Sequence, residues 1–182
     1  MLWVGTWDGV SRWNNLSDTF TYYDATDGLL PGDTVTSVAE DRSGVLWVAT
    51  YGDGLVRVDP VTGASRVYAS DAEDPGSLPD DRVMAVHVDG KDQVWVGMRS
   101  SGLARLDREG DRFEPFAHRP EDPRSLAADA VSVILGDATG SLWVGTYGGG
   151  LDRLPPDGVG FEHFRHDPDD PTRSLIGQPV EQ

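Results

Sequence analysis

Aromatic, acidic and basic side chains recur directly after one short motif of this sequence. The motif is a Leu-Trp-Val-Gly-Thr segment, and its four versions are followed by Trp7 and Asp8, Tyr51 and Asp53, Arg99 and Ser100, and Tyr147. Aromatic rings beside carboxylates and an arginine suit a sugar, which needs a stacking surface and directional hydrogen bonds. The alternative is that these rings only cap a hydrophobic core and keep their polar tips in water.

Other kinds of site have weaker support. The sequence has no Gly-x-Ser-x-Gly elbow, no His-Glu-x-x-His pair and no phosphate-binding loop, so we predict no enzymatic activity for this segment and no cofactor. Clustered carboxylates suit calcium, but the spacing of Asp167, Asp169 and Asp170 matches no calcium loop, and we predict no metal site. His87 stands where other repeats have Ala39 and Leu135, and we expect a buried histidine whose hydrogen bonds are satisfied.

Charge and composition limit the possible partners. The chain of 182 residues has a formal net charge of -16 and a single lysine, Lys91. Such a surface repels phosphate backbones and anionic membranes, so we predict neither nucleic-acid binding nor membrane contact by this segment. The chain has no cysteine, which excludes disulfides and zinc-thiolate sites. No apolar run has the length of a membrane span, and no signal segment precedes the first repeat.

The elements that position these residues form a repeat. Its tryptophans, Trp3, Trp47, Trp95 and Trp143, are 44, 48 and 48 residues apart. Each complete unit reads as four short strands, and the tryptophan lies on the second. The first strands are expected at 35–40, 83–88 and 131–135, and the fourth strands at 20–23, 65–68, 113–116 and 161–164. Asp and Gly in the turns between first and second strands favour hairpins.

Four antiparallel strands in each unit of about 45 residues are typical of a propeller blade. We therefore predict an all-β fold, a β-propeller of four-stranded antiparallel blades, with one tryptophan per blade filling the wedge between neighbours. A recurrent arginine follows in the third strand and is expected to pair with Asp or carbonyl groups within its own blade. The four arginines are Arg12, Arg57, Arg105 and Arg153.

Together these motifs resemble the two-component-regulator propeller repeats. That family's pattern runs through a Leu-Trp-Val-Gly-Thr strand, a Gly-Gly-Leu-x-Arg strand, a Phe-x-x-Tyr strand, an Asp-Pro-x-x-Ser-Leu link and a Val-x-x-Val-x-x-Asp-x-x-Gly strand and turn. The resemblance covers the chain from Leu2 to Val180. Local departures are Ala49 and Met98 in the tryptophan strand, Asp92 at a turn glycine and Ser65 at a strand aromatic.

The resemblance implies a function as well as a fold. Members of this family are extracytoplasmic or periplasmic sensor modules of bacterial hybrid two-component and related signalling proteins, and several of them sense a carbohydrate fragment. On that basis we expect a ligand-sensing module that binds a small molecule or oligosaccharide through Trp7, Tyr51, Asp53, Arg99 and Tyr147. A protein-interaction scaffold is one alternative. A propeller lyase or hydrolase is another, because such enzymes place catalytic groups without a local motif.

The phase of the repeat predicts a partial propeller of about four blades. We expect a partial blade at 1–24, complete blades at 33–70, 81–118 and 129–166, and a truncated strand at 175–182. The last segment either completes the first blade and closes a four-bladed ring or begins a further blade of a larger propeller. We favour the second, in which open blade faces would contact further blades or cause self-association.

Overall fold

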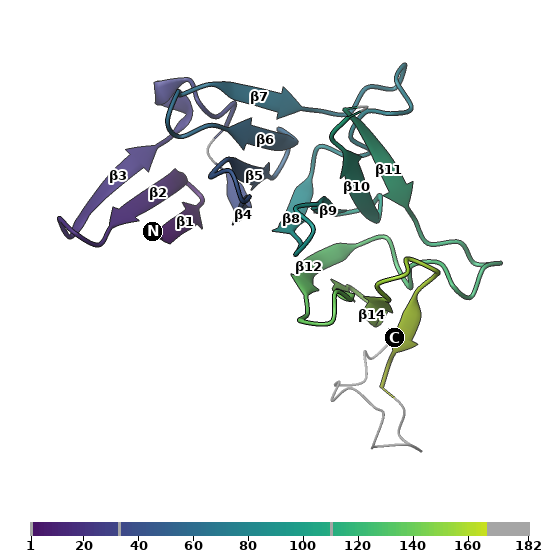
Figure 1. Cartoon of the computed structure of the whole chain (residues 1–182). Coiled ribbons are helices and arrows are strands. Elements are labelled where there is room, and N and C mark those ends of the chain that lie inside the picture. Colours follow the sequence, from purple (N-terminus) through teal and green to yellow (C-terminus); the bar gives the residue numbers. More distant parts are fainter. Residues whose placement is uncertain (1, 33, 110, 167–182) are drawn as a thin grey trace.

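The computed structural model describes residues 2–32, 34–109 and 111–166, and these form four antiparallel sheets that follow one another in an arc (Figure 1). The expected closing or further strand at 175–182 and the carboxylates of Asp167, Asp169 and Asp170 lie outside the described residues. Within the described ranges, no helix is long and apolar enough to cross a membrane. The all-β propeller fold predicted from the sequence is confirmed.

Each sheet is one blade, and its strands are hydrogen-bonded in the order in which they occur in the chain. Blade 1 has three strands, β1 (Leu2–Thr6), β2 (Gly9–Asn14) and β3 (Thr19–Tyr23), and a single 3-10 turn, η1 (Ala25–Asp27), follows it. Blade 2 comprises β4 (Val35–Glu40), β5 (Leu46–Thr50), β6 (Leu55–Val58) and β7 (Ser65–Tyr68). Blade 3 comprises β8 (Val83–Val88), β9 (Val94–Met98), β10 (Leu103–Asp107) and β11 (Arg112–Phe116). Blade 4 comprises β12 (Val131–Gly136), β13 (Leu142–Thr146), β14 (Gly150–Leu154) and β15 (Glu162–Phe164).

A glycine that starts each third strand allows the blade to form. All four have positive φ, between 75° and 116°. A Cβ atom at any of them would lie 2.1–2.6 Å from a carbonyl oxygen at the end of the fourth strand, a distance that atoms cannot share. Any other residue would be strained there and would push the outer strand away. The four glycines are Gly9, Gly54, Gly102 and Gly150.

The core lies between blades, where the tryptophan face of one sheet packs on the aliphatic face of the next. Trp47 and Ala49 of blade 2 contact Val83, Val94 and Met98 of blade 3 within one buried cluster. The innermost strands β1, β4, β8 and β12 meet in succession along the arc. Ala49 and Met98, which depart from the repeat pattern, are both fully buried in this cluster, so they are packing substitutions.

In each complete blade the tryptophan is held by the aspartate of the first hairpin turn. The indole Nε1 of Trp47 donates to Asp41 Oδ2 at 3.3 Å, that of Trp95 to Asp89 Oδ2 at 3.0 Å, and that of Trp143 to Asp137 Oδ2 at 2.8 Å. The other oxygen of each aspartate accepts backbone N–H groups of its own turn. Trp3 differs. Blade 1 has no first strand or turn in the described chain, and the buried Nε1 atom of Trp3 has no hydrogen-bond partner.

These aspartates predict a loss of stability in acid. Burial by itself raises the pKa of Asp41 and of Asp89, but the hydrogen bonds that each accepts outweigh it and hold both pKa values below the usual one. Hydrogen bonds from Thr139 and Trp143 lower the pKa of Asp137. A carboxyl group with a lowered folded-state pKa stabilises the fold above its unfolded pKa of about 4, and the contribution is lost as the pH falls through the folded value.

We therefore expect the urea midpoint to be steady from pH 7 to 5 and to fall below pH about 4. A triple variant, Asp41→Asn, Asp89→Asn, Asp137→Asn, should start less stable and show a weaker fall. Equal acid sensitivity of the variant and the parent chain would remove these three carboxyl groups as the cause.

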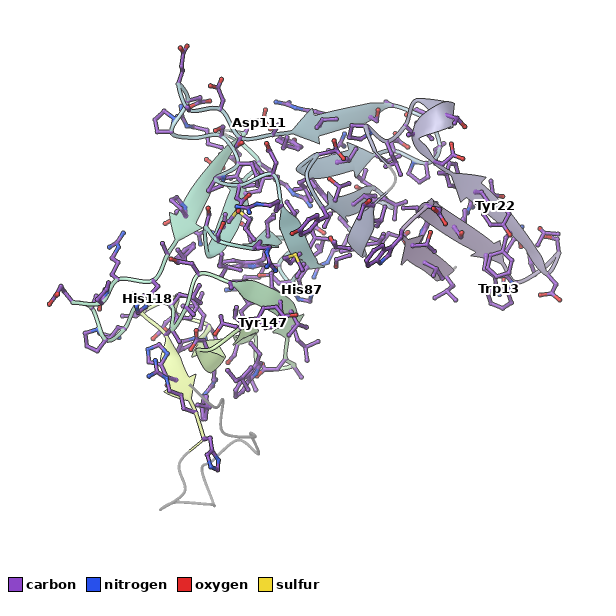
Figure 2. All side chains as sticks on the ribbon, turned by 180° about the vertical axis from the view of Figure 1, so that it is seen from behind. Trp13, Tyr22, His87, Asp111, His118 and Tyr147 are labelled. Atoms are coloured by element: carbon purple, nitrogen blue, oxygen red, sulfur yellow. The ribbon has the colours of Figure 1, made fainter. Side chains whose placement is uncertain are left out.

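The two ends of the arc present open sheet faces. In blade 1 Leu2 is 52% exposed, whereas its repeat equivalent Leu46 is 3% exposed because blade 1 covers it. Trp13 and Tyr22 lie on the same end sheet, away from the other blades (Figure 2). At the other end Leu135 of β12 is 61% exposed. Each open face has the composition of a face that is buried between two blades elsewhere in the molecule. Our prediction remains that further blades, or a second copy of this chain, cover these faces.

Candidate functional site on the link face

One end of the blades collects all the segments that carry the predicted site residues, and we call it the link face. It is formed by the links between second and third strands (7–8, 51–54, 99–102 and 147–149) and by the described residues of the links between blades (24–32 with 34, 69–82 and 117–130). Backbone hydrogen bonds join the two kinds of link in every blade pair. The N–H groups of Tyr51, Arg99 and Tyr147 donate to the carbonyls of Thr34, Arg82 and Ala130 at 2.8–3.0 Å.

The structure brings two of the five predicted residues, Tyr51 and Arg99, together with Ser100 around an arginine that the sequence analysis did not select. Tyr51 and Arg82 form an isolated antiparallel bridge, and the N–H of Arg99 donates to the Arg82 carbonyl. The Arg82 guanidinium donates to Ser100 Oγ at 2.6 Å and to Asp80 Oδ1 at 3.0 Å. Ser100 Oγ also donates to Asp80 Oδ2 at 2.8 Å. Blades 2 and 3 therefore share one polar cluster at this face.

Asp80 fixes the geometry of the cluster. Its side chain is largely buried, and burial alone would raise its pKa. The hydrogen bonds from Arg82 and Ser100 outweigh burial, so the pKa of Asp80 lies below its usual value and the carboxylate is charged at neutral pH. The same hydrogen bond raises the pKa of Arg82, whose side chain remains about half exposed. A guanidinium that is held in one orientation and is exposed to solvent on one side can donate hydrogen bonds to the hydroxyl or carboxylate oxygens of a ligand.

The side chains of the remaining predicted residues have other neighbours. Trp7 is 82% exposed on the link of blade 1, and the N–H of Asp8 donates to Thr6 Oγ1. The Asp53 carboxylate packs against Gly32 of the preceding link, where a Cβ atom would lie 2.2 Å from Oδ2. Tyr147 is exposed on the link of blade 4. In the part of the chain that the structure describes, none of these three residues hydrogen-bonds to Asp80, Arg82 or Ser100, and we centre the candidate site on blades 2 and 3.

Asp80 and Arg82 were missed because the segment Leu78-Pro-Asp-Asp-Arg82 reads as an ordinary blade link. A signal was present in the repeat itself. The equivalent positions in the last link are Ala128 and Ala130, so only one of these two links carries this acidic and basic pair. A charged pair at a single copy of a repeat is a better pointer to function than residues found in several copies.

Two expectations on side-chain partners need correction. Arg105 and Arg153 pair with the glutamates of the fourth strand, Glu114 and Glu162, rather than with Asp or carbonyl groups, and their guanidinium carbons lie 5.8 and 5.7 Å from the ring centroids of Trp95 and Trp143. The expectation of a satisfied His87 is wrong, because its buried Nε2 atom has no hydrogen-bond partner. In the described ranges, no group of three or more His, Asp or Glu side chains is placed to hold a metal ion.

Comparison with known proteins supports the propeller fold. The family model described as the two component regulator propeller matches residues 29–52 and 125–148, each of which ends in a link of the link face. The extracellular domain assigned to a hybrid two-component system of B. thetaiotaomicron is 24% identical with a TM-score of 0.72, over 90% of this chain and 23% of that one. One assigned to a one-component system of the same organism is 22% identical with a TM-score of 0.73, over 95% of this chain and 22% of that one.

Virginiamycin B lyase from Staphylococcus aureus shares the fold at 15% identity, with a TM-score of 0.63 over 90% of this chain and 50% of the enzyme. No curated protein matches the chain. The chain spans less than a quarter of the two extracellular domains, and likeness at this level of identity establishes the fold alone.

Proposed function

We propose that this chain, two segments of which match the two-component-regulator propeller family, is a ligand-sensing propeller module of a signalling protein. We propose further that it works outside the cytoplasm and that its ligand is an oligosaccharide or related polyol bound on the link face. The observation that carries the proposal is the Asp80, Arg82 and Ser100 cluster beside Tyr51. The similar fold of extracellular domains from two-component and one-component systems supports the location.

The chemistry of the cluster fits a sugar. A sugar hydroxyl accepts from one group and donates to another, and the cluster presents the half-exposed Arg82 guanidinium as donor and the exposed Ser100 hydroxyl as donor or acceptor, both oriented by the buried Asp80 carboxylate. The exposed ring of Tyr51 supplies an apolar surface next to them. A bound ligand would touch the links of two blades at once, so it would favour one relative placement of these blades. Such a coupling is what a sensor requires.

A second candidate, a protein-interaction scaffold, is favoured by a different observation. The open apolar faces at both ends of the arc, with Leu2 and Leu135 exposed, have the character of surfaces that contact other protein segments. In that case the link face would be a rim and not the primary site.

Isothermal titration of the chain with a panel of oligosaccharides tests the proposal. For a panel member that binds, Tyr51→Ala and Arg82→Ala should each weaken binding by at least tenfold, while Tyr22→Ala, which removes an exposed tyrosine of the end sheet, should leave it unchanged. Tyr147→Ala reports whether blade 4 contributes. Unchanged affinity in both Tyr51→Ala and Arg82→Ala would contradict the site. A panel without any binder, for a chain that self-associates, would favour the scaffold, and turnover would indicate a propeller enzyme.

A further inference from the structure

The opposite end of the blades, which carries the hairpin turns, is closed between blades 2 and 3 by an arginine. Arg108 of blade 3 reaches back to blade 2, where its Nη2 atom lies 3.1 Å from Asp41 Oδ2, the same oxygen that accepts the Trp47 indole. The Nη1 atom of Arg108 lies 3.1 Å from Asp92 Oδ2, and its guanidinium carbon lies 5.4 Å from the centroid of the Trp47 ring. One guanidinium therefore fills the gap between two turns.

Asp92 completes this cross-link while its backbone adopts an unfavourable conformation. It occupies a turn position that is glycine in the neighbouring blades, and it adopts a φ of 64°, in the left-handed region that disfavours side chains. Besides Arg108, its carboxylate accepts the N–H of Arg42 at 3.0 Å, and the Arg42 guanidinium donates to the Gly90 carbonyl. The departure from the repeat pattern at Asp92 thus has a physical reason, because its side chain ties blade 2 to blade 3.

The equivalent gap between blades 3 and 4 has lost these residues. In repeat register Pro156 replaces Arg108, Gly140 replaces Asp92 and Gly90 replaces Arg42. The carboxylate and indole remain, as Asp89 and Trp95, with the equivalent hydrogen bond between them at 3.0 Å. Among the described residues, no arginine or lysine side chain pairs with Asp89. Between blades 3 and 4 there is instead a groove of about 840 Å³. It occupies the position that Arg108 fills between blades 2 and 3.

The lining of this groove favours a cation. Four carboxylates line it, against two basic side chains, one of which, Arg105, is already paired with Glu114 across the strand. The carboxylates belong to Asp89, Glu114, Asp137 and Asp157, and the basic groups to Lys91 and Arg105. The excess of acidic groups around Asp89 complements a positively charged ligand, as it complements Arg108 in the preceding gap.

A second feature of the groove also points to a ligand. His87, a position that is Ala39 or Leu135 in the neighbouring blades, lines the groove, and its buried Nε2 atom has no partner. Gly136 of blade 4 packs closely on this nitrogen, since a Cβ atom there would lie only 2.7 Å from Nε2. Buried ring nitrogens without a hydrogen bond are rare, because each one forfeits the hydrogen bond that it would make with water. His87 lies on the inner side of the arc (Figure 2).

We propose that the groove between blades 3 and 4 binds a small guanidinium compound, whose cation pairs with the Asp89 carboxylate as Arg108 pairs with Asp41. The ligand's N–H groups would take the place of the Arg108 Nη atoms, and the groove lined by His87 and Trp95 would hold the rest of the molecule. This site is on the opposite end of the blades from the link face and does not depend on the function proposed for that face.

Two small probes of similar shape test the proposal on the intact chain. N-propylguanidinium carries the cation, whereas N-propylurea is its neutral counterpart, and the NMR signal of the Trp95 indole N–H reports binding beside Asp89. We expect the guanidinium probe to shift this signal with at least tenfold higher affinity than the urea. Asp89→Asn, which keeps an acceptor for the indole, should weaken guanidinium binding at least tenfold, while Asp41→Asn should not affect the Trp95 signal.

A second variant keeps the test decisive if Asp89→Asn perturbs the fold. The double change Pro156→Arg, Gly140→Asp copies the natural cross-link of blades 2 and 3 into this gap and should abolish probe binding in a chain at least as stable as the parent. Conversely, Arg108→Ala should make the Trp47 indole respond to the guanidinium probe. The proposal is overturned if the Trp95 indole does not respond, if urea and guanidinium bind equally, or if the filled variant still binds.

Discussion

Replacing Trp47 with alanine is expected to lower the free energy of unfolding by about 3–5 kcal/mol. The Trp47 side chain is 2% exposed, and its ring packs between blade 2 and blade 3. Its centroid lies 6.0 Å from that of Tyr68, and the guanidinium of Arg108 lies on it from the next blade. Removal of the ring would lose its transfer free energy, leave a cavity at a blade interface and take away the indole donor of Asp41.

Urea denaturation followed by circular dichroism measures this effect. Trp7→Ala is the matched control, because it removes the same side chain from an 82% exposed position and should change the free energy of unfolding by less than about 0.5 kcal/mol. Trp3→Ala should fall between the two, since Trp3 is only partly buried and its indole has no acceptor. A loss below about 1 kcal/mol for Trp47→Ala would contradict the packing described here.

Asp152→Ala is expected to destabilise the chain to a similar extent, by about 3–5 kcal/mol. The Asp152 side chain is completely buried in β14. Its Oδ2 atom accepts the N–H of Ala127 at 2.8 Å, and its Oδ1 atom lies 2.6 Å from His163 Nδ1. The other ring nitrogen of His163 lies 2.8 Å from the Pro123 carbonyl. Removing the carboxylate would leave both the Ala127 N–H and the His163 ring without their buried partner.

Glu162→Ala provides the comparison for Asp152→Ala within the same blade. Glu162 is exposed on β15 and pairs with Arg153 at 3.3 Å, so its removal should cost no more than about 1 kcal/mol. Asp152→Asn should be intermediate, because an amide oxygen still accepts the Ala127 N–H. Hydrogen exchange would show where the effect lies, with faster exchange at Ala127 in the alanine variant. Equal stability of Asp152→Ala and Glu162→Ala would show that the buried carboxylate does not anchor the link.

The strands could be predicted from the sequence because one pattern is repeated, and the strand positions in each copy could be compared with those in the others. The first strands of blades 2 and 3 begin and end at the predicted residues, 35–40 and 83–88. The register shift that recurs after Val35, Val83 and Val131 was not predicted, since a bulge depends on the partner strand as well as on its own residues.

The candidate site was predictable only in part. The links that hold Tyr51, Arg99 and Ser100 follow from strand order, but the position of Asp80 and Arg82 between them depends on how a long link folds. The contact of Arg108 with Asp41 joins residues 67 positions apart, and no local pattern encodes it. The useful signal lies in departures from the repeat. Asp92, Arg108, His87 and Arg82 each differ from their equivalents in other blades, and each has a specific contact or an unpartnered atom in the structure.

Mapping backbone amide shifts of the chain by NMR, in a titration with an oligosaccharide that binds, tests the central claim most directly. The account predicts that the changes fall on the link face, at residues 51–54, 80–82 and 99–102, and that the hairpin turns at 41–44 and 89–92 stay unchanged. The guanidinium probe should give the opposite map, with changes at 87–92 and in the turns of blade 4. Oligosaccharide-induced changes confined to the hairpin turns, or to the open faces of blades 1 and 4, would contradict the assignment of the link face as the sensing surface.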